Sequence, residues 1–328
     1  MEGHGWRMGQ ALATARVFDE AAPIVARTQV SADTFELSFR APRIAAAARP
    51  GQFVNVLLPS PDYGYRILDG EQGWRPARSF LLRRPFSIYR RHAAAGAANG
   101  AEALAVLVKV VGDGTRRLVE LPEGSMVKLL GPLGNSFRPP PAGGAAALVA
   151  GGCGWASLGL LARDLRGNGH PTYAFIGAQS VETLPVRTTP ASTRGASFLD
   201  ALPGVCLTSA ELEALGVVVA LAAESGGKVY GGFVTDLLAA FLRKKAPANT
   251  HIYACGPWAM LRRVAELARE HRAPCQVAME EHMACGMGVC NSCVVSVVLP
   301  DGSPGHKKLC VDGPVLDAEE VAWSEQPG

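Results

Sequence analysis

The sequence has little excess of either charge and few charged residues overall. Its 328 residues include 32 Lys or Arg and 29 Asp or Glu, which leaves a net charge of +3. So small an excess does not indicate nucleic-acid binding. Charged residues make up 19% of the chain and hydrophobic residues 48%, a balance that excludes disorder and allows a sizeable core. The length predicts about two domains, with a third if one is small.

Sequence features of secretion and membrane insertion are also missing. Residues 1–20 carry acids and contain no continuous apolar segment of the kind found in signal peptides. The uncharged segment 142–162 is long enough to cross a bilayer, but it holds six glycines and a Gly-Gly-Cys-Gly interruption. That pattern indicates a buried strand, a glycine turn and a helix. We therefore expect a soluble, cytoplasmic protein with no membrane partner.

Residues 23–138 have the pattern of a small β-domain, and residues 1–22 are expected to form a tail. Short alternating or β-branched segments are separated by Pro, Gly and Asp, with no convincing helix between them. The polar segment 59–83 is interpreted as an insertion loop. This spacing predicts an antiparallel barrel with strands at 24–30, 34–40, 52–57, 104–111 and 126–130.

The pattern changes at three consecutive prolines, residues 139–141. From there to about residue 272, apolar strands alternate with helical segments, which predicts a doubly wound parallel sheet. Residues 273–328 form a short last unit, and no internal repeat is present. In the middle segment we expect a loop at 186–196, strands at 145–150, 172–177, 217–221 and 251–255, and helices at 157–166, 233–245 and 258–271.

Four of the eight cysteines crowd into residues 285–310 of the last unit. Cys285, Cys290 and Cys293 follow the pattern C-x4-C-x2-C, and Cys310 comes after 16 further residues. This is the plant-type [2Fe–2S] spacing, in which two irons bridged by two sulfides take four thiolates. The clustering indicates metal in a reducing compartment rather than a disulfide scaffold. Structural zinc, which usually takes two close cysteine pairs, and buried free thiols are the alternatives.

The other four cysteines show no ligand spacing. They are interpreted as small core residues, and they are Cys153, Cys206, Cys255 and Cys275.

Two motifs in the barrel segment could hold a phosphate-bearing cofactor. In Arg-Pro-Phe-Ser at 84–87, the Arg can bind a phosphate through paired hydrogen bonds and the Ser can reach a ring nitrogen. The Gly-Asp-Gly-Thr turn at 112–115 can present amides and a hydroxyl to a diphosphate. A surface Arg and an ordinary hairpin turn are the alternatives.

Two loops of the middle segment lie between a predicted strand and a predicted helix. Gly-Gly-Cys-Gly at 151–154 follows one strand, and Cys-Gly-Pro at 255–257 follows another. Loops at the carboxyl ends of parallel strands, at helix N-termini, accept phosphates. The first loop lacks the spaced G-x-G-x-x-G fingerprint, so by itself it indicates only that a nucleotide is possible. Both loops are expected to frame one crevice.

Taken in order, the motifs resemble one family closely. The chain contains, in sequence, RRPFSI, GDGT, LLGPLGNSF, the strand–GGCG–helix unit, GGFVTDLL, YACGPWAML, MACGMGVCNSCVV and CVDGPVLDA. Over about residues 23–321 it resembles the electron-transfer subunits of class 1B dihydroorotate dehydrogenase, which belong to the ferredoxin reductase-like superfamily. The resemblance implies an FAD-binding barrel at 23–138, an NAD-binding domain at 139–272 and a small [2Fe–2S] domain at 273–328.

The resemblance also implies which residues form the sites. Arg84 would lie near the FAD diphosphate and Ser87 near the isoalloxazine. The whole FAD site would comprise Arg84, Pro85, Phe86, Ser87, Leu107, Val108, Lys109, Gly114 and Thr115. The NAD site would comprise Gly151, Gly152 and Gly154 at the phosphates and Cys255, Gly256 and Pro257 near the nicotinamide. The cluster ligands would be Cys285, Cys290, Cys293 and Cys310.

The sequence departs from the family pattern at two positions after the first glycine loop. Trp155 replaces a small or aliphatic residue and is expected to crowd the dinucleotide, and Ser157 stands where Pro is common. The insertion at 59–83 is longer than the family pattern, and the segment 224–227 matches an acidic-glycine segment of the family only loosely.

The expected function is electron transfer from NADH through FAD and a [2Fe–2S] cluster. The acceptor would be the FMN of a separate catalytic subunit that interconverts dihydroorotate and orotate in pyrimidine biosynthesis, in a heterotetramer with two of each subunit. No acid–base or nucleophile constellation stands out, and none is needed when cofactors supply the chemistry. Two alternatives are a stand-alone NAD(P)H reductase serving a ferredoxin or oxygenase, and a non-enzymatic metal-binding or redox-sensing module.

Overall fold

The structure is a computed structural model of the chain. The residues that it describes leave out most of the predicted tail and most of the predicted insertion loop. They also leave out part of the loop at 186–196 and Cys206. The described residues are 16–59, 82–92, 102–190, 207–225, 227–244 and 246–324.

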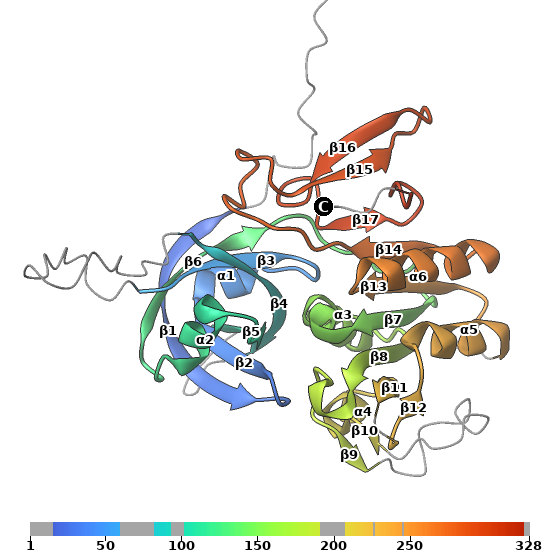
Figure 1. Cartoon of the computed structure of the whole chain (residues 1–328), viewed down its shortest axis with the longest axis horizontal. Helices are drawn as coiled ribbons and strands as arrows, with labels where there is room; N and C mark the ends of the chain where they lie inside the picture. The colour runs from blue at the N-terminus through green and yellow to red at the C-terminus, as the bar shows by residue number, and fades with distance from the viewer. Residues whose placement is uncertain are drawn as a thin grey trace, which may run out of the picture.

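Six antiparallel strands close into the predicted barrel (Figure 1). Their order around the barrel is β1-β2-β5-β4-β3-β6. Alternate side chains such as Val54 and Val56 point into its apolar core. The strands are β1 (Phe18–Gln29), β2 (Thr34–Arg40), β3 (Phe53–Leu57), β4 (Arg84–His92), β5 (Ala103–Lys109) and β6 (Met126–Leu133).

The barrel differs from the prediction at three places. Strand β1 begins at Phe18, and residues 18–23 pair with β6, so the barrel starts before residue 23. Strand β4 was not expected, since its sequence Arg-Pro-Phe-Ser-Ile-Tyr-Arg-Arg-His is too polar to alternate clearly. Two helices, α1 (Pro42–Ala47) and α2 (Asp113–Glu120), also contradict the expectation that the segment has none. The predicted turn at 112–115 is the N-terminus of α2.

A seven-stranded sheet confirms the doubly wound fold, in the order β12-β11-β8-β7-β13-β14-β17. All neighbouring pairs are parallel except β14 with β17. Its strands are β7 (Ala145–Gly151), β8 (Thr172–Ser180), β11 (Val218–Ser225), β12 (Tyr230–Gly231), β13 (Thr250–Cys255), β14 (Cys275–Ala278) and β17 (Val315–Asp317).

Helices cover both faces of this sheet. On one face, α3 (Trp155–Gly167) packs against β7 and α4 (Ala210–Ala214) packs against β11. On the other, α5 (Val234–Lys244) packs against β7, β8 and β11, and α6 (Trp258–Glu270) packs against β13 and β14. Short 3-10 turns follow β7 and β8; they are η2 (Gly152–Gly154) and η3 (Val181–Thr183). A separate two-stranded pair is formed by β9 (Thr189–Pro190) and β10 (Leu207–Thr208).

The last segment is divided between the sheet and a hairpin. Strands β14 and β17 extend the sheet beside β13, and β15 (Val294–Val298) pairs with β16 (Pro304–Lys308) as an antiparallel hairpin. Cys293 and Cys310, which flank the hairpin, are buried in the same apolar cluster as α5 and α6. This segment therefore shares a core with the sheet. The domain boundaries at 138 and 272 stay predictions.

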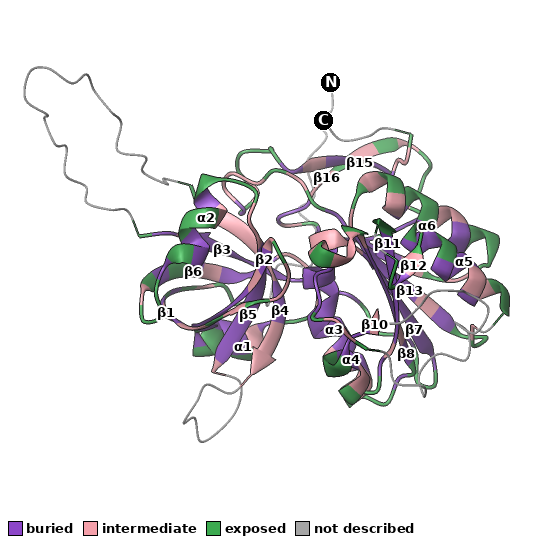
Figure 2. Cartoon of the chain, turned by 60° about the horizontal axis from the view of Figure 1, so that its bottom comes forward, coloured by how far each residue is buried: buried purple, intermediate pink, exposed green. Residues whose placement is uncertain are grey.

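Helix α3 joins the barrel to the sheet, and Figure 2 shows it as mostly buried between them. Tyr89 of β4 packs so closely on Gly159 of α3 that a Cβ there would overlap the ring. Arg91 of β4 also pairs with Asp164 of α3 at 3.1 Å. These contacts hold β4 of the barrel against α3, which follows the central strand β7 of the sheet. No helix in the described residues has the length and hydropathy to cross a membrane.

Candidate functional site

A cavity of about 840 Å³ lies where the central strands of the parallel sheet end. It is bordered by the loops after β7 and β13, the ends of β8 and β11, and Lys109 of the barrel. Strand β7 lies between β8 and β13, so the strand order reverses here. Open α/β sheets bind ligands at such a switch point, outside the carboxyl ends of the strands.

The two glycine loops meet at this cavity. Gly151, Gly152, Gly154, Gly256 and Pro257 all line it. A Cβ on Gly151 would lie only 2.6 Å from the Cδ atom of Pro257, so the loops are in direct contact. They therefore frame one crevice, in the arrangement that the sequence predicts.

Trp155 corrects one expectation. Its side chain is fully buried and does not line the cavity. It lies in the apolar cluster that also contains Tyr89 and Leu107 of the barrel. Because α3 begins at Trp155 and turns this side chain toward the barrel, the indole packs the junction and does not crowd the crevice.

Ser157, the second departure, connects the barrel strand to the second glycine loop. Its hydroxyl lies 2.8 Å from the Ser87 hydroxyl of β4 and 3.4 Å from the Cys255 sulfur. The Cys255 thiol is also 3.6 Å from Oε1 of Glu280, which follows β14 and lines the cavity. Four polar groups thus form a continuous chain from the barrel to the cavity.

Burial shapes the ionisation of this chain. Glu280 is exposed to the cavity, but protein surrounds its carboxyl and removes most of its contact with bulk water. This desolvation raises the pKa of the carboxyl, and the hydrogen bond from Cys255 partly offsets the rise. Burial, and then the charge of Glu280, raise the pKa of the fully buried Cys255 thiol well above its ordinary value. Cys255 is therefore a neutral hydrogen-bond donor at physiological pH.

Arg84 and the start of α2 form a cationic corner on the barrel. The Arg84 guanidinium lies against Gly114, where a Cβ would overlap it, and its Nη1 donates to the Leu82 carbonyl at 3.2 Å. The Thr115 hydroxyl accepts hydrogen bonds from the N–H groups of Val111 at 3.0 Å and Gly112 at 3.2 Å, so it closes the turn. A guanidinium beside the N-terminal amides of a helix suits a phosphate.

The remaining predicted barrel residues lie on β4 and β5. Pro85, Phe86 and Ser87 are half-buried along β4. On β5, the Val108 side chain is buried inside the barrel, and Leu107 packs in the cluster between barrel and sheet. Lys109 reaches the cavity and pairs with Asp33 at 3.4 Å.

The cysteine loop folds around its own sulfur atoms. The Gly288 N–H donates to the Cys310 sulfur at 3.1 Å, and the N–H groups of Val289 and Cys290 donate to the Cys285 sulfur at 3.4 Å. Gly286 and Gly288 have φ angles of +68° and +84°, which favour glycine and allow this curl. Amides directed at sulfur stabilise ligating thiolates and tune a cluster.

The four thiols interact as two pairs. Cys290 contacts Cys285, and its pKa is lowered to about 6, chiefly by hydrogen bonds to Ser292. Cys310 contacts Cys293, and burial raises its pKa to about 12. In the described part of the chain, no three His, Cys, Asp or Glu side chains gather as ligands of a single ion. Two thiolates for each of two irons is the [2Fe–2S] ligand pattern.

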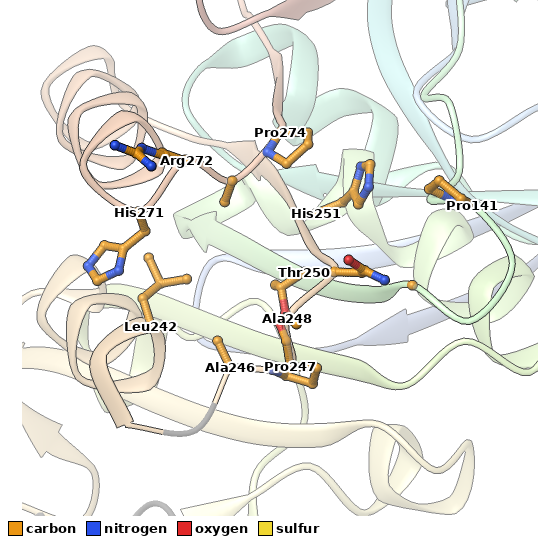
Figure 3. A pocket seen from close by; sticks show the side chains of 13 residues that line it. Pro141, Leu242, Ala246, Pro247, Ala248, Thr250, His251, His271, Arg272 and Pro274 are labelled. Carbon is orange, nitrogen blue, oxygen red and sulfur yellow. The ribbon is translucent and has the colours of Figure 1, made fainter.

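A second hollow, of about 480 Å³, lies at the opposite edge of the sheet (Figure 3). It is bordered by Thr250, where β13 begins, and by the segment after α6. His251 and His271 lie apart across it and do not converge. None of the predicted site residues lines this hollow.

Sequence reasoning missed two polar residues of the site. Glu280 ends the short strand segment Cys-Gln-Val-Ala-Met-Glu, where a carboxylate at the end of a buried strand was an available signal. Asn55 interrupts the apolar strand Phe-Val-Asn-Val-Leu, and its Nδ2 donates to the Cys285 carbonyl at 3.4 Å. Ser157 was noticed only as a departure, because its partners are distant in sequence.

Comparison with known proteins identifies the family. Residues 280–322 match the family model described as the iron-sulfur cluster binding domain of dihydroorotate dehydrogenase B. The electron transfer subunit of dihydroorotate dehydrogenase B (NAD(+)) from Desulforamulus reducens is 30% identical over 94% of this chain and 99% of that protein. This chain belongs to that family of electron transfer subunits. The subunit of the same name from Geobacillus thermodenitrificans is also 30% identical, over 91% of this chain and 96% of its own length.

Solved structures agree with the fold of this electron transfer subunit. An NADH-dependent reduced ferredoxin–NADP oxidoreductase matches with a TM-score of 0.67 and 25% identity, covering 93% of this chain and 91% of its own. The ferredoxin reductase of a carbazole 1,9a-dioxygenase matches with a TM-score of 0.51 at 21% identity, over 78% of this chain and 65% of its own, and shows the fold alone.

Proposed function

We propose that the chain carries electrons from NADH through FAD and a [2Fe–2S] cluster to an FMN-containing catalytic subunit, which interconverts dihydroorotate and orotate in pyrimidine biosynthesis. The observation that supports this most directly is the convergence of three sites at one end of β14. Glu280 faces the cavity, Cys285 begins the cysteine loop five residues later, and Asn55 of the barrel contacts Cys285.

The residues around each site fit the proposed cofactors. The guanidinium of Arg84 and the amides at Gly114 and Thr115 suit the FAD diphosphate, and Ser87 offers a hydroxyl toward the junction where the cavity begins. The glycine loops at 151–154 and 255–257 let a dinucleotide backbone approach closely. The paired thiols and inward amides of the cysteine loop suit the cluster.

The division of labour follows from these placements. NADH supplies two electrons as a hydride, FAD accepts them and passes them on singly, and the cluster carries one at a time. The protein's part is to hold each site in register: Ser157 links the flavin strand to the nicotinamide loop, and Asn55 links that barrel face to the cluster loop. The partner assembly, two chains of each kind, is part of the proposal.

A stand-alone reductase is the second candidate, because the NADH-dependent oxidoreductase with a TM-score of 0.67 covers as much of the chain as the family relatives do. The two functions differ in their acceptor. The purified chain should reduce the FMN of its cognate catalytic subunit faster than it reduces a ferredoxin. The reverse order would favour the second candidate.

The test of the main proposal begins with cofactor content and a cysteine variant. Iron, acid-labile sulfide and flavin should be present at one [2Fe–2S] cluster and one FAD per chain. In Cys293→Ala, which removes a buried thiol, NADH should still bleach the flavin in a stopped-flow experiment, whereas reduction of the partner's FMN should collapse. The matched control is Cys275→Ala, which removes a thiol outside the cluster loop. Stoichiometric zinc without sulfide, or full FMN reduction by a cluster-free variant that keeps its flavin, would overturn the proposal.

A further inference from the structure

Asn55 is a buried polar side chain in an otherwise apolar strand. Asn55 is 1% exposed. Its Nδ2 donates to the main-chain carbonyl of Cys285 at 3.4 Å, across 230 residues of sequence. Among the described residues, none lies within hydrogen-bonding distance of its Oδ1. A buried amide oxygen left unpaired is destabilising, so this residue calls for a reason beyond stability.

The register of β3 places Asn55 on the outer face of the barrel. Val54 and Val56, on either side of it, point into the barrel core. Asn55 is directly opposite Pro85 on β4, within the segment that runs from Arg84 to Ser87. The side chain therefore stands between the proposed flavin strand and the cysteine loop.

The cysteine loop is shaped to receive this side chain. A Cβ on Gly286 would overlap Nδ2 of Asn55, so the amide packs directly on the loop backbone next to Cys285. The donor must face the carbonyl, since the opposite orientation of the amide would set two oxygens against each other. The unpaired Oδ1 follows from this orientation.

Asn135 ties down the other end of the cysteine segment. Its Nδ2 donates to the carbonyls of Asp312 at 3.1 Å and Val315 at 2.8 Å, and its Oδ1 accepts from the Val315 N–H at 2.9 Å. This amide is fully paired, as an ordinary structural asparagine is. Asn55 differs because, among the described residues, its side chain makes a single hydrogen bond, to the main chain of the predicted ligand Cys285.

We propose that Asn55 is a positioning residue that ties the first cluster ligand, Cys285, to the flavin-binding face of the barrel. This inference rests on the proposed function. The contact fixes the cluster loop against β3 and so sets the geometry of the flavin-to-cluster step. Hydride transfer at the cavity does not depend on it, because Asn55 does not line the cavity.

The experiment compares Asn55→Leu with wild type in the complete, cofactor-loaded chain. Leu has the same branching and number of side-chain heavy atoms and removes the donor, and Asn168→Leu, at an exposed amide after α3, is the matched control. We expect unchanged FAD content and unchanged flavin bleaching by NADH. Iron release to excess EDTA should be about fivefold faster, the ratio expected for one lost hydrogen bond. Electron transfer from photoreduced flavin to the cluster should slow, and the electron paramagnetic resonance signal of the reduced cluster should shift.

A second pair of variants keeps the inference testable if Asn55→Leu folds poorly. Asn55→Asp keeps the shape but faces the Cys285 carbonyl with an acceptor, and should show the same three changes. In a double-mutant cycle, Gly286→Ala should be less damaging in an Asn55→Ala background than in wild type, since the overlapping amide is gone.

The outcomes separate this inference from the proposed function. If wild-type chain holds neither flavin nor cluster, the proposed function fails. If it holds both and NADH bleaches the flavin, but the Asn55 variants match wild type in iron release, resonance signal and flavin-to-cluster rate, only the role of Asn55 is refuted.

Discussion

Ser157→Ala tests whether the polar chain between the barrel and the cavity positions the hydride-transfer site. The substitution removes one hydroxyl that lies 2.8 Å from Ser87 and 3.4 Å from the Cys255 sulfur. Ser157 is 4% exposed, so bulk water does not replace it readily. Ser87 is half-buried and can recover part of its hydrogen bonding from water, whereas Glu280 is the one other partner of the Cys255 thiol among the described residues.

The expected loss is that of about one net hydrogen bond, about 1 kcal/mol. That corresponds to a roughly fivefold lower limiting rate of flavin reduction by NADH. The concentration of NADH giving half the limiting rate should stay near the wild-type value, because the glycine loops that would hold the phosphates are untouched. The effect should therefore appear in the limiting rate of flavin reduction and not in the NADH concentration that gives half of it.

The measurement is anaerobic stopped-flow reduction of the flavin over a range of NADH concentrations. Flavin content must equal that of wild type. Ser209→Ala is the matched control, because Ser209 is also buried, at 1% exposed, but precedes α4 and lies outside the polar chain of Ser87, Ser157, Cys255 and Glu280. A Ser157→Ala chain with the wild-type limiting rate, or one whose whole defect lies in NADH affinity, would refute the positioning argument.

Three further predictions concern single charged residues. Arg84→Ala should weaken FAD binding roughly ten- to hundredfold in equilibrium dialysis, whereas Arg83→Ala, which breaks a 3.0 Å pair with Asp19, should keep its FAD; equal losses would contradict the assignment. Burial raises the pKa of Glu280, so ionising this carboxyl lowers the stability of the folded chain as the pH rises above the ordinary pKa of glutamate. Glu280→Gln should therefore have a higher melting temperature than wild type at about pH 7 but not at about pH 4. Glu224 borders the cavity at the end of β11, where its charge should repel the 2′-phosphate of NADPH. Glu224→Gln should therefore raise the ratio of NADPH to NADH turnover about tenfold, and an unchanged ratio would exclude this role.

Local patterns were enough to predict the two folds and the class of metal centre. The alternation of strand and helix segments predicts the central strands β7, β8, β11 and β13, because each buried strand is a short apolar run. The predicted turn at 112–115 proved to be a helix start, since a glycine turn and an N-terminal helical turn share the same residues. Polar β4 was missed because side chains such as Tyr89 and Arg91 pack on α3, a contact that no local pattern in β4 indicates.

The cysteine spacing by itself favoured a [2Fe–2S] centre over zinc, because three of the four clustered cysteines lie within nine residues and the fourth follows one hairpin. Only the tertiary structure decided which residues connect the three sites. Ser87 and Ser157 are 70 residues apart, Ser157 and Cys255 are 98 apart, and Asn55 and Cys285 are 230 apart. No periodicity relates such pairs; they meet because α3 packs on β4 and because the last segment returns to the barrel.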